Sequence, residues 1–359
     1  MIHFCTLFDS NYLTRGLALY ESLEKRCPSF HLYVISFDRN SYEYLKNAGL
    51  PNLTPVALQD FEDQQLLAVK PSRSIAEYCW TCTPSVILYC IEKYHLPSCT
   101  YVDADMIFYH NPQLLLDEMG GRSVLISEHR YTKEYERGAV VNGIYCVQFM
   151  YFKNDSDGMT ALRWWRERCL EWCYDRLEDG KFGDQKYLDD WPARFEGVHV
   201  MQHLGGALAP WNLQQYSFSW KGDQLFAKYL KTGISYPVIF FHYHGLKFFS
   251  NRMATCSGTL FDIDTNAKEH LYFPYLKQLV QIERRLKEEE GVTFDPTGAR
   301  RPAPGKLWVL AGFIKELGSM ILLGNITPFR LKNYNFIRHY HFYKLDRFNC
   351  PPGSKMNKF

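Results

Sequence analysis

The sequence predicts an α/β fold with a mostly parallel central sheet flanked by helices. Short apolar, β-branched and aromatic runs alternate along the chain with longer segments of helical periodicity, which is the pattern of βα units. At 359 residues, 46% hydrophobic and 22% charged, the composition is that of a globular protein and excludes collagen-like, disordered and disulfide-knot classes. The longest apolar stretch, 307–323, contains Lys315 and Glu316, so no run reaches the roughly 18 apolar residues of a membrane-spanning helix.

Each expected element follows from its hydrophobic period. Strands are expected at 2–8, 31–37, 99–102, 123–127, 145–152, 197–201 and 237–242. Helices are expected at 12–26, 74–94, 159–178 and 266–290. In the third helix, apolar residues recur at spacings of three to five and predict a buried stripe, formed by Leu162, Trp165, Cys169, Trp172 and Leu177.

Charge and breaker residues divide the chain unevenly. We expect one large domain over 1–295, a linker-like segment rich in proline and glycine over 296–305, and a basic, aromatic and helical appendage over 306–359. Residues 300–359 carry eleven lysines and arginines against two acidic residues. Such a segment suits an anionic membrane surface, an anionic acceptor or nucleic acid, or it packs its aromatic residues on the main domain.

The eleven cysteines are an odd number spread over a long chain, which is not the composition of a disulfide-stapled scaffold. The close pairs Cys79/Cys82 and Cys169/Cys173 lack the four ligands that structural zinc requires. We therefore expect reduced thiols and a cytoplasmic protein.

The pattern D-x-D occurs three times, and its context separates the three. Asp103-Ala104-Asp105 closes the apolar run 99–102, and open α/β sheets bind ligands at the carboxyl ends of their strands. Two carboxylates at this spacing can share one divalent cation and leave positions for phosphate oxygens. Asp155 lies in a polar turn before a helix, and Asp262 follows no clear strand.

A second polar cluster, His242-Tyr243-His244-Gly245-Leu246-Lys247, follows the apolar run 237–241. His242 and His244 lie on one side of an extended chain, so either could complete a carboxylate-bound metal site. Gly245 would admit a diphosphate closely, and Lys247 could neutralise it. The alternative is a pair of structural histidines beside a turn.

Two further clusters are weaker when taken alone. Asp184 and Gln185 follow Gly183 at the start of a short helix, where Asp184 would otherwise be an N-cap. Asp9, Asn11 and Tyr12 end the first expected strand, where they could hold a base and ribose or merely cap the next helix.

The order of these four clusters is more specific than any one of them. It resembles the retaining GT-A-fold glycosyltransferases of the glycogenin and lipopolysaccharide galactosyltransferase type over about residues 1–250. The runs 172–174, 184–188 and 209–213 are also similar to a bacterial set of nucleotide-sugar transferases.

The resemblance implies a GT-A-like nucleotide-sugar-binding catalytic domain and a role for each matching residue. Asp103 and Asp105 would bind Mn²⁺ or Mg²⁺, with His242 as the third ligand and His244 as its rival. Asp184 and Gln185 would lie by the reactive carbon of the sugar. The donor site would be lined by Leu7, Asp9, Asn11, Tyr12, Arg73, Asp103, Ala104, Asp105, Gly245 and Lys247.

The sequence also departs from the family pattern. One residue instead of two separates Gly245 from Lys247, and Asn142-Gly143 comes early for the family's Asn-x-Gly. The arginine expected on the helix before D-x-D is missing, and Lys70 or Arg73 would replace it.

We therefore expect a metal-dependent hexosyltransferase that uses a nucleotide sugar, a UDP-sugar by resemblance. Its acceptor would be a glycan or glycolipid in surface polysaccharide or lipopolysaccharide synthesis. The enzyme would be cytoplasmic or peripheral at the inner face of the membrane through 306–359, and we expect no nucleic-acid partner. Two alternatives remain: a nucleotidyltransferase, and a non-catalytic binding protein that keeps the fold.

Overall fold

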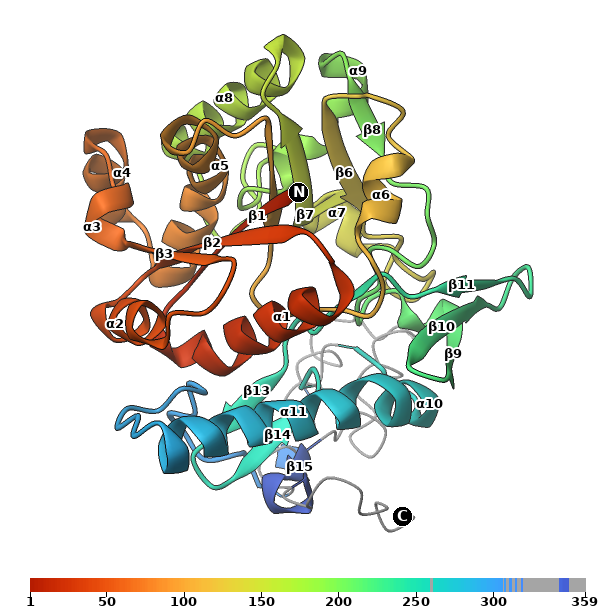
Figure 1. The fold of residues 1–359 in the computed structure, drawn as a ribbon. Coiled ribbons are helices and arrows are strands. Elements are labelled where there is room, and N and C mark those ends of the chain that lie inside the picture. The colour runs from red at the N-terminus through yellow and green to blue at the C-terminus, as the bar shows by residue number, and fades with distance from the viewer. Residues whose placement is uncertain are drawn as a thin grey trace.

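A computed structural model describes residues 1–258, 261–305 and 342–348, together with isolated positions between 307 and 318. Its centre is a seven-stranded sheet in the order β3-β2-β1-β4-β7-β6-β8 (Figure 1). The strands are β1 (Ile2–Phe8), β2 (Phe30–Ser36), β3 (Leu53–Ala57), β4 (Ser98–Val102), β6 (Val124–Glu128), β7 (Tyr145–Lys153) and β8 (Val198–Val200). All neighbouring pairs are parallel except those made by β7, so the predicted mostly parallel sheet is confirmed.

Helices cover both faces of the sheet (Figure 1). Buried residues of α1 and α11 pack on one face, and those of α5 and α8 pack on the other. The helices are α1 (Leu13–Arg26), α2 (Arg39–Ala48), α3 (Leu58–Phe61), α4 (Gln64–Val69), α5 (Ile75–Lys93), α6 (Gln113–Asp117), α7 (Gly138–Asn142), α8 (Ser156–Glu171), α9 (Trp191–Arg194), α10 (Thr265–Ala267) and α11 (Phe273–Arg284). Among the described residues, no helix combines the length and the apolar character needed to cross a bilayer.

The third expected helix ends earlier than its hydrophobic period predicts. The interpretation 159–178 is wrong at both ends: α8 begins at Ser156, where Asp155 caps it, and ends at Glu171. Trp172 is extended, and Glu178 pairs with Lys181 in an isolated β-bridge. The apolar stripe therefore continues in the sequence past the point at which the backbone leaves the helix.

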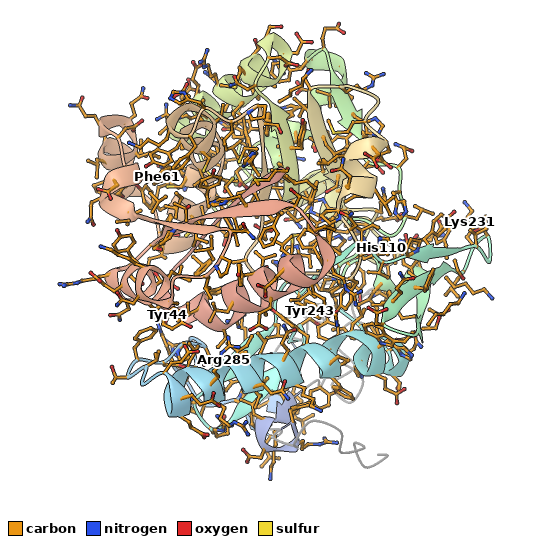
Figure 2. The ribbon with its side chains drawn as sticks, viewed as in Figure 1. Tyr44, Phe61, His110, Lys231, Tyr243 and Arg285 are labelled. Carbon is orange, nitrogen blue, oxygen red and sulfur yellow. The ribbon has the colours of Figure 1, made fainter. Side chains whose placement is uncertain are left out.

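Three smaller sheets extend the central one. β5 (Met106–Phe108) pairs with β12 (Phe240–His242). β9 (Tyr216–Lys221), β10 (Gln224–Tyr229) and β11 (Ser235–Pro237) form a sheet that projects from the body, with Lys231 at its tip (Figure 2). The expected strand 237–242 is thus divided, because Pro237 ends β11 and Phe240 begins β12.

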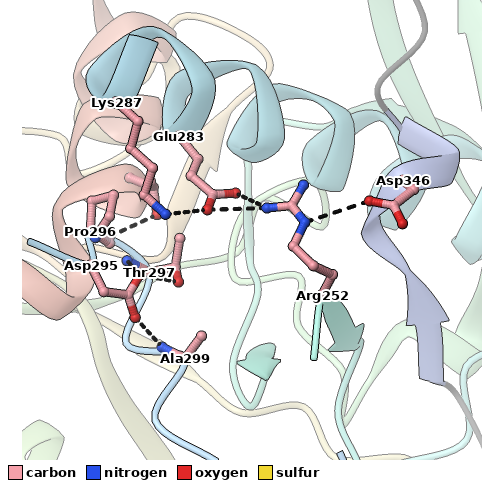
Figure 3. Close-up of polar contacts among 9 residues, drawn as sticks. Arg252, Glu283, Lys287, Asp295, Pro296, Thr297, Ala299 and Asp346 are labelled. Carbon is pink, nitrogen blue, oxygen red and sulfur yellow. Dashed lines mark hydrogen bonds and ion pairs between the residues drawn. The ribbon is translucent and has the colours of Figure 1, made fainter. Parts of the chain in front are cut away.

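The third small sheet joins the last described segment to the body. It consists of β13 (Lys247–Phe249), β14 (Met253–Thr255) and β15 (Phe342–Lys344). Arg252 beside β14 forms ion pairs with Glu283 of α11 and with Asp346 (Figure 3). Within the expected helical appendage, residues 342–344 are therefore a strand, and most of 306–359 lies outside the described residues.

Aromatic and charged side chains link α11 and the segment after it to α2 and to the loop after β12. Tyr243 is fully buried and stacks on Tyr275 of α11 at 3.9 Å between ring centroids (Figure 2). Tyr44 of α2 faces Arg285, and both contact Glu290 (Figure 2). These contacts join α11 and the segment after it to the loop after β12 and to α2.

Candidate active site

Two carboxylates and one imidazole converge at the carboxyl end of β4. Asp103 and Asp105 lie in the turn between β4 and β5, and His242 ends β12, which pairs with β5 through His242 and Met106. The possible ligand atoms of these three side chains all lie within 4.8 Å of one another. Nε2 of His242 is 3.1 Å from Oδ1 of Asp105 and 3.6 Å from Oδ2 of Asp103. The geometry therefore suits a single cation.

Backbone hydrogen bonds hold the turn that carries the carboxylates. The amide of Met106 donates to the carbonyl of Asp103 at 3.3 Å, and the amide of Tyr243 donates to the carbonyl of Asp105 at 3.0 Å. The phenol of Tyr101 donates to Oδ1 of Asp103 at 3.0 Å. Because these bonds come from β4, β5 and β12, the cluster is fixed by the sheet rather than by a loop alone.

The three groups shift one another's pKa. Burial alone would raise the pKa of Asp105, but the neighbouring His242 lowers it to about 2. Burial and the charge of Asp105 raise the pKa of Asp103, although His242 opposes them. Burial would lower the pKa of His242, but Asp105 and Asp103 raise it. A divalent cation would satisfy both carboxylates in place of the imidazole proton.

Two residues that sequence reasoning missed as site residues support His242. Gln148 in β7 is fully buried, and its Oε1 lies 2.9 Å from Nδ1 of His242. Trp211 is 4% exposed and packs edge-on against both His242 and His244, with ring centroids 5.6 Å apart in each case. The sequence marks neither role, because a glutamine in an apolar strand and a tryptophan in a loop have no fixed spacing to the histidine.

Asp184 is buried, with 6% of the residue exposed, and is not a helix cap. The helical turn Lys186–Leu188 has Gln185 at its N-cap position without a side-chain cap bond. The carbonyl of Asp184 accepts from the indole of Trp165 at 2.8 Å. Burial and the charge of Asp103 raise the pKa of the Asp184 carboxyl to about 8. The charge of Asp103 therefore acts on the Asp184 carboxyl.

The loop after β1 forms a compact hydrogen-bonded turn. Asp9 accepts from the amide of Asn11 at 3.0 Å and from its side chain at 2.7 Å. Tyr12 is 39% exposed, and the guanidinium of Arg15 lies 4.3 Å from its ring centroid. Because β1 and β4 are parallel neighbours, this loop and Asp103 share one edge of the sheet.

The loop after β12 places its polar residues at the surface near His242. His244 is exposed, and Gly245 has a φ of +80°, a conformation that favours glycine. Lys247 is exposed at the start of β13. The rival ligand His244 is not part of the group whose ligand atoms converge, which contains His242.

The remaining predicted donor-site residues are distributed differently. Leu7 is buried near the end of β1, before the loop that carries Asp9. Ala104 is buried in the turn between β4 and β5. Arg73 lies over the ring of Tyr174 at 3.9 Å and donates to the carbonyl of Leu170, at the carboxyl end of α8. Lys70, its alternative, forms an ion pair with Glu62 at 2.5 Å.

The other two D-x-D patterns have structural explanations. Asp155 accepts from the amide of Gly158 and caps α8, as its position before a helix predicts. Asp264 accepts from the amide of Ala267 and caps α10. Only the D-x-D at the end of β4 meets a histidine among the described residues.

No protein-family model matches the chain. It is 31% identical to the Bacillus subtilis (strain 168) "Uncharacterized protein YfnF" over 254 residues, which cover 69% of this chain and 82% of YfnF. It is 27% identical to "Uncharacterized protein YfnD" of the same organism over 280 residues, which cover 77% of this chain and 88% of YfnD.

Similar solved structures are glycosyltransferases. They include the bifunctional WbbM (TM-score 0.46, 12% identity, 80% of this chain) and the galactosyltransferase LgtC with donor and acceptor sugar analogues (0.41, 16%, 68% of this chain and 87% of LgtC). Mouse xyloside xylosyltransferase 1 is similar at 0.42 and 13%, over 68% of this chain and 97% of that one. The chain spans about half of WbbM, 51%. The resemblance to GT-A-fold glycosyltransferases that the sequence predicts is therefore confirmed.

Proposed function

Because the chain belongs to the family of the uncharacterized YfnF, we propose its function from the site: a metal-dependent glycosyltransferase that moves a hexose from a UDP-sugar to a glycan or glycolipid. The observation that carries the proposal is the convergence of Asp103, Asp105 and His242 at one sheet edge with the loop after β1. Hard carboxylate oxygens with one imidazole nitrogen form a donor set that suits Mn²⁺ or Mg²⁺.

A cation held by Asp103, Asp105 and His242 would offset the negative charge that grows on the diphosphate when its bond to the sugar breaks. The chain itself supplies orientation around that point. Asp9 and Asn11 fix the turn in which we place the nucleoside, and the exposed Lys247 adds a positive charge beside the loop after β12.

Asp184 and Gln185 are proposed to contact the sugar. Burial and the charge of Asp103 raise the pKa of the Asp184 carboxyl to about 8 in the metal-free protein, and in its protonated form this carboxyl can donate a hydrogen bond to a sugar hydroxyl. Gln185 is half-buried beside it and offers both a donor and an acceptor. Retention of configuration and an acceptor in surface polysaccharide or lipopolysaccharide synthesis follow the resemblance and belong to the same proposal. Contact of 306–359 with an anionic membrane also belongs to it and follows from the basic charge of that segment.

The test is metal-dependent release of nucleotide. Thermal shifts with UDP-, GDP-, CMP- and ADP-sugars plus Mn²⁺ identify the donor through ligand-linked stabilisation. We expect hydrolysis of the stabilising sugar to stop with EDTA and to fall by about 100-fold or more in Asp105→Asn, since the cation contributes several kcal/mol. Asp157→Asn, in the exposed second D-x-D, is the matched control and keeps full activity. Undiminished hydrolysis in EDTA would contradict the metal. Conversion of the nucleotide sugar and added pyrophosphate to a nucleoside triphosphate and a sugar 1-phosphate would instead indicate a nucleotidyltransferase.

A further inference from the structure

Gln148 contacts both halves of the proposed metal site from the centre of β7. Its backbone carbonyl accepts from the amide of Asp103 at 3.2 Å, which ties β7 to the residue that begins the D-x-D turn. Its side-chain Oε1 lies 2.9 Å from Nδ1 of His242, the third proposed ligand. The glutamine is fully buried and the His242 side chain is only 5% exposed, so water cannot readily replace this bond.

The surrounding bonds determine which end of the Gln148 amide faces the histidine. The hydroxyl of Ser127 donates its single proton to the carbonyl of Cys146 at 3.4 Å. Ser127 Oγ is therefore an acceptor for Nε2 of Gln148, which lies 3.5 Å away. This leaves Oε1, which can only accept, for His242, and a proton on Nδ1 would complete that hydrogen bond.

We propose that Gln148 is the positioning residue that holds His242 as the Nδ1–H tautomer, with the Nε2 lone pair directed between Asp103 and Asp105 for a divalent cation. The inference rests on the metal site of the proposed function. Ring nitrogens of metal-binding histidines are commonly fixed by such a partner on the opposite nitrogen. The alternative tautomer would place a proton on Nε2, which lies 3.1 Å from Oδ1 of Asp105. That proton would form a hydrogen bond with Asp105 and occupy the position of the cation.

The test compares a variant without an acceptor with one that keeps it. Gln148→Met has similar length but no acceptor, whereas Gln148→Glu retains a carboxyl oxygen opposite Nδ1. Thr100→Val is the control, since Thr100 is fully buried in β4 and its hydroxyl has no partner among the described residues. Mn²⁺ binding to the metal-free, full-length protein is measured from free Mn²⁺ by electron paramagnetic resonance.

We expect Gln148→Met to bind Mn²⁺ about 10- to 100-fold more weakly than wild type, the usual effect of removing such a partner. Gln148→Glu should recover most of the affinity, and Thr100→Val should match wild type. Equal affinity of Gln148→Met and wild type overturns the inference. Wild-type affinity no greater than that of Asp105→Asn instead overturns the metal site of the proposed function, so the two failures are distinguishable.

A measurement on the unaltered protein covers the case in which Gln148→Met does not fold. In protein labelled with ¹⁵N-histidine and saturated with Mg²⁺, the His242 ring nitrogens are assigned by their loss in His242→Gln. A protonated Nδ1 with an unprotonated Nε2 supports the inference. A proton on Nε2 and none on Nδ1 refutes it, whatever the variants do.

Discussion

Arg15 joins three separate segments beside the proposed donor site, and its removal is expected to destabilise the fold. The side chain is 3% exposed. Nη1 donates to the carbonyls of Asn11 at 3.4 Å and Thr297 at 3.2 Å, and Nη2 donates to the carbonyl of Leu246 at 3.2 Å. One guanidinium therefore joins the loop after β1, the loop after β12 and the segment that follows α11.

The size of the effect follows from the acceptors that Arg15→Met would abandon. A buried acceptor that loses its partner costs about 1–3 kcal/mol, and three rather long bonds place the loss of unfolding free energy at about 3–5 kcal/mol. Arg15→Lys keeps the charge but not the planar fork, so it should retain only part of the stability. Arg39→Met, at a side chain that is 87% exposed, should have little effect on the free energy of unfolding.

The assay is urea unfolding of the full chain followed by tryptophan fluorescence, with Arg39→Met as the matched control. We expect a clearly lower midpoint for Arg15→Met at an unchanged slope, with Arg15→Lys between it and wild type. Equal midpoints for Arg15→Met and Arg39→Met would refute the reasoning, because the three bonds would then contribute no net stability. A midpoint for Arg15→Lys equal to that of wild type would show that charge alone is sufficient.

Two further predictions concern acid sensitivity and backbone strain. Burial would raise the pKa of Asp38, but hydrogen bonds from Ser10 and Ser41 outweigh burial and lower it below its ordinary value of 3.8. The stability that Asp38 contributes is therefore complete above about pH 4 and is lost as the pH falls through the lowered pKa. The difference in urea midpoint between wild type and Asp38→Asn should shrink on acidification, and a difference independent of pH would contradict this. Gly143 has a φ of +103°, and a Cβ there would lie 2.9 Å from Oδ1 of Asp189, so Gly143→Ala should lower the thermal midpoint more than Gly120→Ala at an open turn, and equal shifts would contradict the steric argument.

The elements with a clear hydrophobic period could be predicted from the sequence, whereas their ends and directions could not. The expected strands at 2–8 and 99–102 match β1 and β4 closely. The antiparallel direction of β7 has no counterpart in its composition, because a strand buried on both faces is apolar whichever way it runs. The end of α8 was missed because Trp172 and Cys173 beyond Glu171 are buried by tertiary packing rather than by the helix. Leu177, which the periodicity predicts to be buried, is 48% exposed.

The same division holds within the candidate site. Asp103 and Asp105 could be proposed because they follow an apolar strand, and open α/β sheets bind ligands at such strand ends. His242 was joined to them as the third ligand by the resemblance to the GT-A glycosyltransferases. The choice between His242 and His244 required the pairing of β12 with β5, which sets His242 opposite Met106. Sequence spacing gives both histidines the same face of an extended chain, so only the register could separate them.

The residues that sequence reasoning missed share one physical property: they act through another side chain. Gln148 and Trp211 are buried and contact His242 from β7 and from a loop, respectively. A residue that binds a ligand directly must have a particular chemistry at a particular strand end, which a motif can record. A supporting residue needs only to reach one ring nitrogen or one ring face, and any element packed against β12 can provide it. Such partners therefore have no fixed place in the sequence and are defined only by the hydrogen bonds and ring contacts that the fold makes.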